Sequence, residues 1–192
     1  LLDLSNNQKI IPEITIDKNI WGEASCSRSE ADAYGPHGID IVQRDNGTYQ
    51  IGVINHFPYE SVEMFELSKN TESWELIWKG CIAVPEDLYF NDIGLKADGS
   101  FYASHMYRRD ITENEWLINS LFKSNSGHVV IWKDGDFIKV PNTEGSGPNG
   151  ILLDEESDLL YISYNQGDKI SIFDLSTNTM GVDYFVQSPD NI

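Results

Sequence analysis

Short apolar runs alternate with polar turn residues along most of the chain, which is the pattern of β-strands joined by tight turns. The runs with the length and residue content of strands cover residues 39–42, 49–54, 62–67, 150–153, 159–164 and 169–173. One segment differs: Thr112 and Glu115 form a capping-box pattern that leads into the apolar residues Trp116, Leu117 and Ile118. We therefore predict an all-β fold with one short inserted helix.

The strands fall into a repeat that begins with polar residues. The repeated starts are Pro36-His37-Gly38-Ile39-Asp40, Phe90-Asn91-Asp92-Ile93-Gly94, Pro148-Asn149-Gly150-Ile151-Leu152 and, at the last residues of the chain, Pro189-Asp190-Asn191-Ile192. The unit ends are also alike, at Leu2–Ser5, Phe65–Ser68 and Phe173–Ser176. Units of about 40–55 residues that hold four short strands are typical of a β-propeller.

The repeat divides the chain into parts of a single propeller domain, 1–192. The predicted parts are the tail of a blade (1–33), a blade (34–85), a blade with an insertion at 107–122 (86–142), a blade (143–186) and the start of another (187–192). Three to four blades do not close a ring, so we expect the remainder of the propeller to be missing from this sequence. The opening at Leu1, without a methionine or a signal-peptide pattern, also suggests truncation, and the compartment stays undetermined.

Residues at the same place in successive blades meet near the central axis of a propeller. The residues that would converge there are His37, Asn91, Asp92, Asn149, Asp190 and Asn191. Amide and carboxylate oxygens are the ligands that Ca²⁺ prefers, and such a group would be costly to desolvate without a cation. Asn and Asp are also common where a turn leads into a strand. Their recurrence in four units favours the metal.

The hairpin turns predict which histidines meet. If Asn46-Gly47 is a two-residue turn, His37 lies directly opposite His56, and two imidazoles in contact can relay protons. The alternative is that the two histidines only make ordinary backbone hydrogen bonds at a strand end. The same reasoning with Asp98-Gly99 sets Asp92 opposite His105. His128 is expected at the surface.

Charge and composition limit the classes of binding partner that we expect. The 31 acidic and 13 basic residues give a formal net charge of −18, which argues against nucleic acid or an anionic membrane as a partner. No apolar run is long enough to predict a transmembrane helix. Cys26 and Cys81 can either pair or remain free. The G-x-G-x-x-G pattern at 145–150 is not a dinucleotide motif, because strand-like residues follow it where a helix is needed.

The sequence resembles the paraoxonase/arylesterase family of calcium-dependent lactonases. The matching runs are Pro36-His37-Gly38-Ile39, Val53-Ile54-Asn55-His56, Val62-Glu63-Met64-Phe65, Asn91-Asp92-Ile93 with Phe101-Tyr102, Asn149-Gly150-Ile151 and Asp190-Asn191-Ile192. The wider six-bladed propeller group, which includes the gluconolactonases and regucalcin-like proteins, shares the positions of Asn91, Asn149 and Asp190. The His37/His56 pair makes the paraoxonase-like family the better match.

The resemblance implies a six-bladed propeller with two calcium ions. A catalytic calcium would be held by Asn91, Asn149, Asp190 and Asn191, and a structural calcium by Asp92 and the backbone carbonyl of Ile39. His37 would activate water as the general base, with His56 behind it. The family also takes a Glu ligand from its first blade. That segment would precede Leu1, so we expect residues 1–192 alone to be inactive.

The activity that the resemblance implies is hydrolysis of a small-molecule lactone or aryl ester. A gluconolactonase-type hydrolase of sugar lactones is the alternative within the same group. The third possibility is a binding module without catalysis, in which the metal only stabilises the propeller. The apolar insertion at 107–122 would either cover the mouth of the site or pack onto the neighbouring blade.

Overall fold

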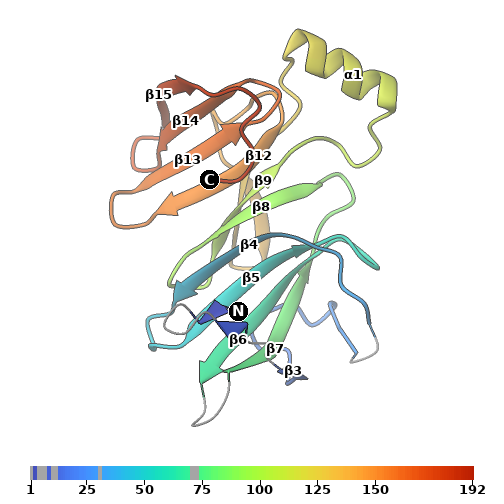
Figure 1. The fold of residues 1–192 in the computed structure, drawn as a ribbon, viewed down its shortest axis with the longest axis vertical. Helices are drawn as coiled ribbons and strands as arrows, with labels where there is room; N and C mark the ends of the chain where they lie inside the picture. The colour runs from blue at the N-terminus through green and yellow to red at the C-terminus, as the bar shows by residue number, and fades with distance from the viewer. Residues whose placement is uncertain (1, 4–7, 10–12, 30–31, 70–73) are drawn as a thin grey trace.

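The computed structural model describes residues 2–3, 8–9, 13–29, 32–69 and 74–192 (Figure 1). The strands are β1 (Leu2–Asp3), β2 (Gln8–Lys9), β3 (Glu13–Ile16), β4 (Pro36–Gln43), β5 (Tyr49–Asn55), β6 (Ser61–Lys69), β7 (Trp74–Ala83), β8 (Phe90–Leu95), β9 (Phe101–His105), β10 (His128–Lys133), β11 (Asp136–Lys139), β12 (Pro148–Asp154), β13 (Leu159–Tyr164), β14 (Lys169–Asp174) and β15 (Thr179–Phe185). The helix is α1 (Glu113–Phe122).

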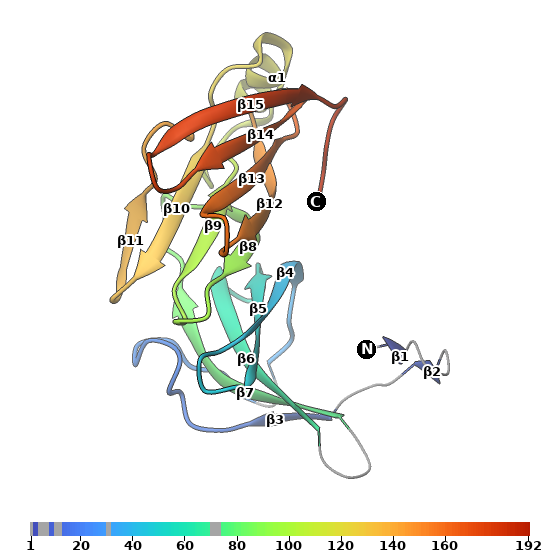
Figure 2. The same ribbon diagram turned by 90° about the vertical axis from the view of Figure 1, so that its left-hand side faces the viewer.

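Three large sheets follow one another along the chain. Their strand orders are β3-β7-β6-β5-β4, β8-β9-β10-β11 and β12-β13-β14-β15, and a small β1-β2 pair stands apart. Figures 1 and 2 show the sheets stacked in sequence order, with β4, β8 and β12 side by side. The all-β prediction is confirmed. The described residues do not form a closed ring, so the six-bladed propeller stays a prediction.

The segment before β4 is fastened to the first sheet. β3 pairs in parallel with β7 at the outer edge. A disulfide joins Cys26 to Cys81, and buried Arg28 makes an ion pair of 2.8 Å with buried Glu63. The sequence had left the state of the two cysteines open. The predicted unit end at Leu2–Ser5 lies partly outside the described residues, at Leu4 and Ser5.

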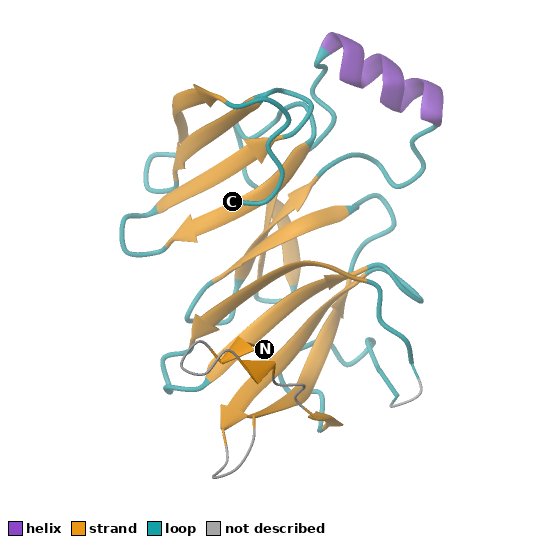
Figure 3. Ribbon diagram, viewed as in Figure 1, coloured by secondary structure: helices purple, strands orange, loops and turns teal. Residues whose placement is uncertain are grey.

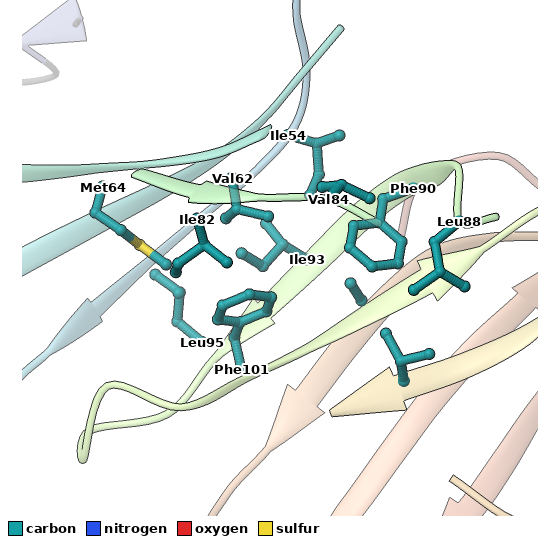
Figure 4. Close-up of a cluster of buried hydrophobic side chains, with 12 residues drawn as sticks. Ile54, Val62, Met64, Ile82, Val84, Leu88, Phe90, Ile93, Leu95 and Phe101 are labelled. Carbon is teal, nitrogen blue, oxygen red and sulfur yellow. The ribbon is translucent and has the colours of Figure 1, made fainter. Parts of the chain in front are cut away.

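Two apolar cores lie between the sheets, because the alternation along the strands directs apolar side chains to the faces that meet. The first core joins Ile54, Val62, Met64 and Ile82 of the first sheet to Phe90, Ile93, Leu95 and Phe101 of the second (Figure 4). The second core joins Tyr102 and Val129 to Ile151, Leu160, Ile162 and Phe173 of the third sheet. Each sheet therefore buries its inner residues against the next sheet in the sequence.

The hairpin register differs from the prediction. Gln43 pairs with Tyr49, and the N–H of Arg44 donates to the carbonyl of Thr48, so the loop has three residues with Gly47 in the left-handed region. The loop between β8 and β9 is built in the same way and ends with Gly99, which also has a positive φ. A three-residue loop shifts the ladder by one residue compared with a two-residue turn. The predicted pairing of Asp92 with His105 is therefore wrong.

A β-bulge recurs at the start of β4, β8 and β12, each of which is an edge strand of one large sheet. The register shifts between Pro36 and Ile39 in β4, between Phe90 and Ile93 in β8, and between Pro148 and Ile151 in β12. A bulge leaves a residue unpaired and turns side chains away from their regular direction. The repeated polar starts of the sequence are thus the bulges of three equivalent strands.

Helix α1 stands away from the sheets (Figure 3). Its predicted capping box is confirmed, since the side chain of Thr112 accepts from the N–H of Glu115 and that of Glu115 accepts from Thr112. No residue of the helix is buried, and Leu121 and Phe122 are 69% and 77% exposed. Close packing of these side chains onto a blade is therefore not observed. No helix in the described part of the chain is long and apolar enough to span a bilayer.

Candidate functional site

The bulges of neighbouring sheets touch one another. A Cβ atom built on Gly38 would lie 2.5 Å from the carbonyl oxygen of Asn91 and 2.5 Å from Oδ1 of Asp92. Only a residue without a side chain permits this approach of β4 to β8. The next contact is a hydrogen bond of 3.0 Å from the N–H of Ile151 in β12 to Oδ2 of Asp92.

The C-terminal segment continues this row. A Cβ atom on Gly150 would lie 2.5 Å from the carbonyl oxygen of Asp190 and 2.7 Å from Cα of Asn191. Figure 2 shows the segment after β15 returning beside β12. The structure therefore brings the predicted polar segments together in the order β4, β8, β12 and C-terminal segment.

Two buried amide oxygens in this row lack a hydrogen-bond partner. They are Oδ1 of Asn91 and Oδ1 of Asn149, and their residues are only 4% and 5% exposed. On the other side of the Asn91 amide, Nδ2 lies 3.6 Å from Sδ of Met106. An unsatisfied buried acceptor costs about 1–3 kcal/mol, which a bound cation or water removes. The two oxygens come from equivalent bulge positions in adjacent sheets, and oxygen donors of this kind suit Ca²⁺.

The pKa values of the carboxyl groups beside them are raised, and a bound cation would lower them. Burial raises the pKa of Asp92, and the negative charges of Asp40 and Asp190 add to this effect. Burial also raises the pKa of Asp40, although its carboxylate accepts from the N–H groups of Leu95 and Ile41. Within the described residues no three His, Cys, Asp or Glu side chains cluster as a metal site.

The two histidines predicted to meet are in contact. Nδ1 of His37 lies 2.9 Å from Nε2 of His56. The other nitrogen of His56, Nδ1, lies 2.7 Å from Oε2 of Glu60. If Glu60 is ionised it accepts from Nδ1–H of His56, Nε2 of His56 then accepts from Nδ1–H of His37, and Nε2 of His37 keeps its lone pair.

Aromatic rings hold His56 in this orientation. Its imidazole stacks on Tyr89 with centroids 4.7 Å apart, and Tyr89 stacks on Tyr107 at 5.3 Å. Burial lowers the pKa of His37, and the neighbouring His56 lowers it further, whereas Asp190 and Glu60 raise it.

The other two histidines form a separate pair. His128 of β10 lies directly opposite His105 of β9, with ring centroids 4.9 Å apart. His128 is partly exposed, in line with its expected place at the surface, but its contact with His105 was not predicted. His105 is buried, and its Nδ1 accepts from the N–H of Tyr89 instead of meeting Asp92.

Sequence reasoning missed Glu60 and two buried serines, Ser104 and Ser163, that contact the bulges. The only sequence signal for Glu60 is its position four residues after His56. The serines occupy corresponding places one residue before His105 and Tyr164, which an alignment of the repeats by their second strands would have shown. For the predicted structural ion, Ile39 follows the β4 bulge and Asp92 lies in the adjoining β8 bulge.

Comparison with known proteins gives a distant structural similarity. No protein-family model matches the sequence, and no curated protein matches it. Among solved structures, the chain is similar to the crystal structure of a "putative 6-phosphogluconolactonase" from Bacteroides uniformis, with a TM-score of 0.48 and 19% sequence identity. The match covers 84% of this chain and 43% of that chain. The chain thus spans less than half the length of that protein.

Proposed function

We propose that this chain carries the catalytic groups of a calcium-dependent hydrolase of lactones or aryl esters. The observation that supports the proposal most strongly is the contact between bulges that hold two unpaired amide oxygens, Asn91 Oδ1 and Asn149 Oδ1, and a bulge that holds one member of a histidine pair. The proposal takes the two oxygens as ligands for a cation and His37 as the general base.

The donor set fits a calcium ion. Asn91 and Asn149 would hold it through their unpaired oxygens, together with Asp190 and Asn191 of the C-terminal segment. When bound, calcium would supply Lewis-acid polarisation of the substrate carbonyl, which is worth several kcal/mol of the barrier. Asp92 and the carbonyl of Ile39 are the proposed ligands of a second, structural calcium.

His37 acts as the general base in this proposal. Its Nε2 accepts a proton from the attacking water, while Nδ1 donates to His56. Glu60 fixes the tautomer of His56 and stabilises the positive charge that develops on the imidazole pair. General base catalysis of this kind contributes a factor of about 10²–10⁴ to the rate.

The test uses the whole protein that contains these residues. Hydrolysis of a panel of aliphatic, aryl and sugar lactones is measured with calcium and with EDTA, and calcium binding is measured in parallel. We expect Asn149→Ala to lose calcium binding and activity together, and His37→Gln to keep calcium but lose rate. Asn114→Ala, at an exposed position in α1, is the matched control.

The outcomes also separate the alternatives. Turnover that prefers sugar lactones would favour a gluconolactonase-type enzyme with the same metal. Calcium binding without any esterase or lactonase turnover would favour a binding module and contradict the catalytic proposal. Full activity of Asn149→Ala in the presence of EDTA would exclude the role of the metal.

A further inference from the structure

Two buried serines make equivalent bridges, Ser104 from the second large sheet to the third and Ser163 from the third to the C-terminal segment. The hydroxyl of Ser104 in β9 accepts from the N–H of Asp92 at 3.0 Å and donates to the carbonyl oxygen of Asn149. The hydroxyl of Ser163 in β13 accepts from the N–H of Gly150 at 2.7 Å and donates to the carbonyl oxygen of Asp190 at 2.5 Å. Both serines are fully buried.

Each bridge begins at a bulge and ends at the next polar segment. Asp92 and Gly150 are equivalent bulge residues of β8 and β12, where the regular ladder leaves the backbone N–H without its usual partner. The serine beside each of them supplies the acceptor. The O–H of the serine then donates to a backbone carbonyl in the next polar segment, that of Asn149 in one case and that of Asp190 in the other.

The first sheet lacks this device. Ile54 occupies the corresponding position, opposite the β4 bulge, and carries no hydroxyl. The next residue is Asn55, whose Oδ1 accepts from the N–H of Gly35 in its own sheet. Its Nδ2 donates to the carbonyls of Phe57 and Tyr59 and to Ser61. The serine bridge is thus confined to the two sheets whose neighbours carry the proposed ligands Asn149 and Asp190.

We propose that Ser104 and Ser163 are positioning residues of the cation site, an inference that rests on the calcium proposal above. Each serine hydroxyl donates one hydrogen bond and accepts another, so its proton is committed to the bridge. Ser104 sets the backbone of Asn149 and thereby the direction of the unpaired Oδ1. Ser163 holds Asp190 against β12. One hydroxyl therefore joins the second large sheet to the third, and the other joins the third sheet to the C-terminal segment.

The primary experiment is a calcium titration of the whole protein and its variants by calorimetry. We expect Ser104→Ala and Ser163→Ala to weaken calcium binding by about tenfold or more, since residues that orient metal ligands typically contribute 10–100-fold to affinity. Ser104→Thr keeps a hydroxyl and should recover most of the affinity.

The matched control is Ser171→Ala. Ser171 of β14 is equally buried, and its hydroxyl donates to Oδ1 of Asp183, away from the bulges. Its loss should lower the melting temperature without weakening calcium binding. If Ser104→Ala and Ser171→Ala bind calcium equally well, the positioning role is wrong while the calcium proposal stands. If the unmodified protein binds no calcium, the calcium proposal itself fails, and this inference falls with it.

A second measurement on the unmodified protein covers the case in which the serine variants do not fold. Amide hydrogen exchange is followed at Asp92 and Gly150, the two donors to the serines. Calcium should slow the exchange of both amides, because a bound ion holds the ligands to which the bridges lead. Unchanged exchange at both amides on saturation with calcium would contradict the inference.

Discussion

Nδ1 of His37 lies 2.9 Å from Nε2 of His56, although the backbone of His56 bonds to Gly35 and not to His37. The bulge between Pro36 and Ile39 explains this contact. It turns the side chain of His37 out of the regular alternation of β4 and toward the neighbouring strand. The pair is therefore a product of the bulge, and equivalent bulges place Asn91 and Asn149 in the adjoining sheets.

Glu60→Gln tests the orientation of the histidine pair. The variant removes the negative charge that the imidazole of His56 contacts at 2.7 Å, and charge-assisted hydrogen bonds are stronger than neutral ones by about 1 kcal/mol. We expect kcat for lactone hydrolysis to fall by about three- to tenfold with unchanged calcium affinity. Glu156→Gln, at an exposed turn position, is the control. A kcat equal to that of the control would exclude a role for the carboxylate.

Gly38→Ala tests the contact between the bulges of β4 and β8. The added methyl group would lie 2.5 Å from both the carbonyl oxygen of Asn91 and Oδ1 of Asp92, so the two strands must move apart. We expect a loss of about 1–3 kcal/mol in the free energy of unfolding, together with weaker calcium binding. Gly181→Ala has its nearest neighbour at 3.2 Å and should have a smaller effect. Equal urea midpoints for the two variants would contradict the close approach.

The histidine pair of the second sheet predicts a dependence of stability on pH. Burial and the neighbouring His128 lower the pKa of His105 from its ordinary value of 6.5 to about 4, against a smaller opposing effect of Asp87, and Lys139 lowers it slightly. The unfolded chain therefore binds the proton first as the pH falls. Stability from this group is complete above about pH 6.5 and is lost progressively between there and about pH 4, by up to about 3 kcal/mol.

This dependence is measured by urea unfolding at a series of pH values for the unmodified protein and for His105→Gln. The difference in the free energy of unfolding between the two proteins should shrink as the pH falls from 7 to 4. A constant difference over this range would show that His105 titrates alike in the folded and unfolded states.

Reduction of the disulfide tests how the segment before β4 is held. Cys26 and Cys81 are separated by 55 residues, and closing a loop of this length stabilises the fold by about 4 kcal/mol in the chain-entropy model. We expect dithiothreitol to lower the melting temperature of the unmodified protein, whereas the double variant Cys26→Ser/Cys81→Ser should not respond. A melting temperature that dithiothreitol leaves unchanged would contradict this contribution.

Much of the fold follows from local patterns in the sequence. Strands 49–54 and 159–164 were predicted from apolar runs within about one residue of β5 and β13, and the capping box at Thr112 located α1. Register was not predictable in the same way. Asn46-Gly47 favours a two-residue turn, yet the chain forms a three-residue loop. The bulges shift the register a second time, and no residue preference predicts them.

The candidate site was predictable where the repeat itself carries the signal. The repeated starts contain His37, Asn91-Asp92 and Asn149, and the bulges show that Asn91 is the member equivalent to His37 and Asn149. Ser104 was missed because its partners, Asp92 and Asn149, are 12 and 45 residues away along the chain. Glu60 lies only four residues after His56 but belongs to no motif. The closed ring stays a prediction, because the large sheets of the described residues do not close.

The central claim is that Oδ1 of Asn91 and Oδ1 of Asn149 bind one calcium ion. It is tested most directly by calorimetric titration of calcium into the whole protein and into Asn91→Ala and Asn149→Ala, with folding of each variant checked by circular dichroism. The account predicts saturable binding to the unmodified protein and its loss in both folded variants. Binding of equal strength in all three proteins, or no binding to the unmodified protein, would contradict it.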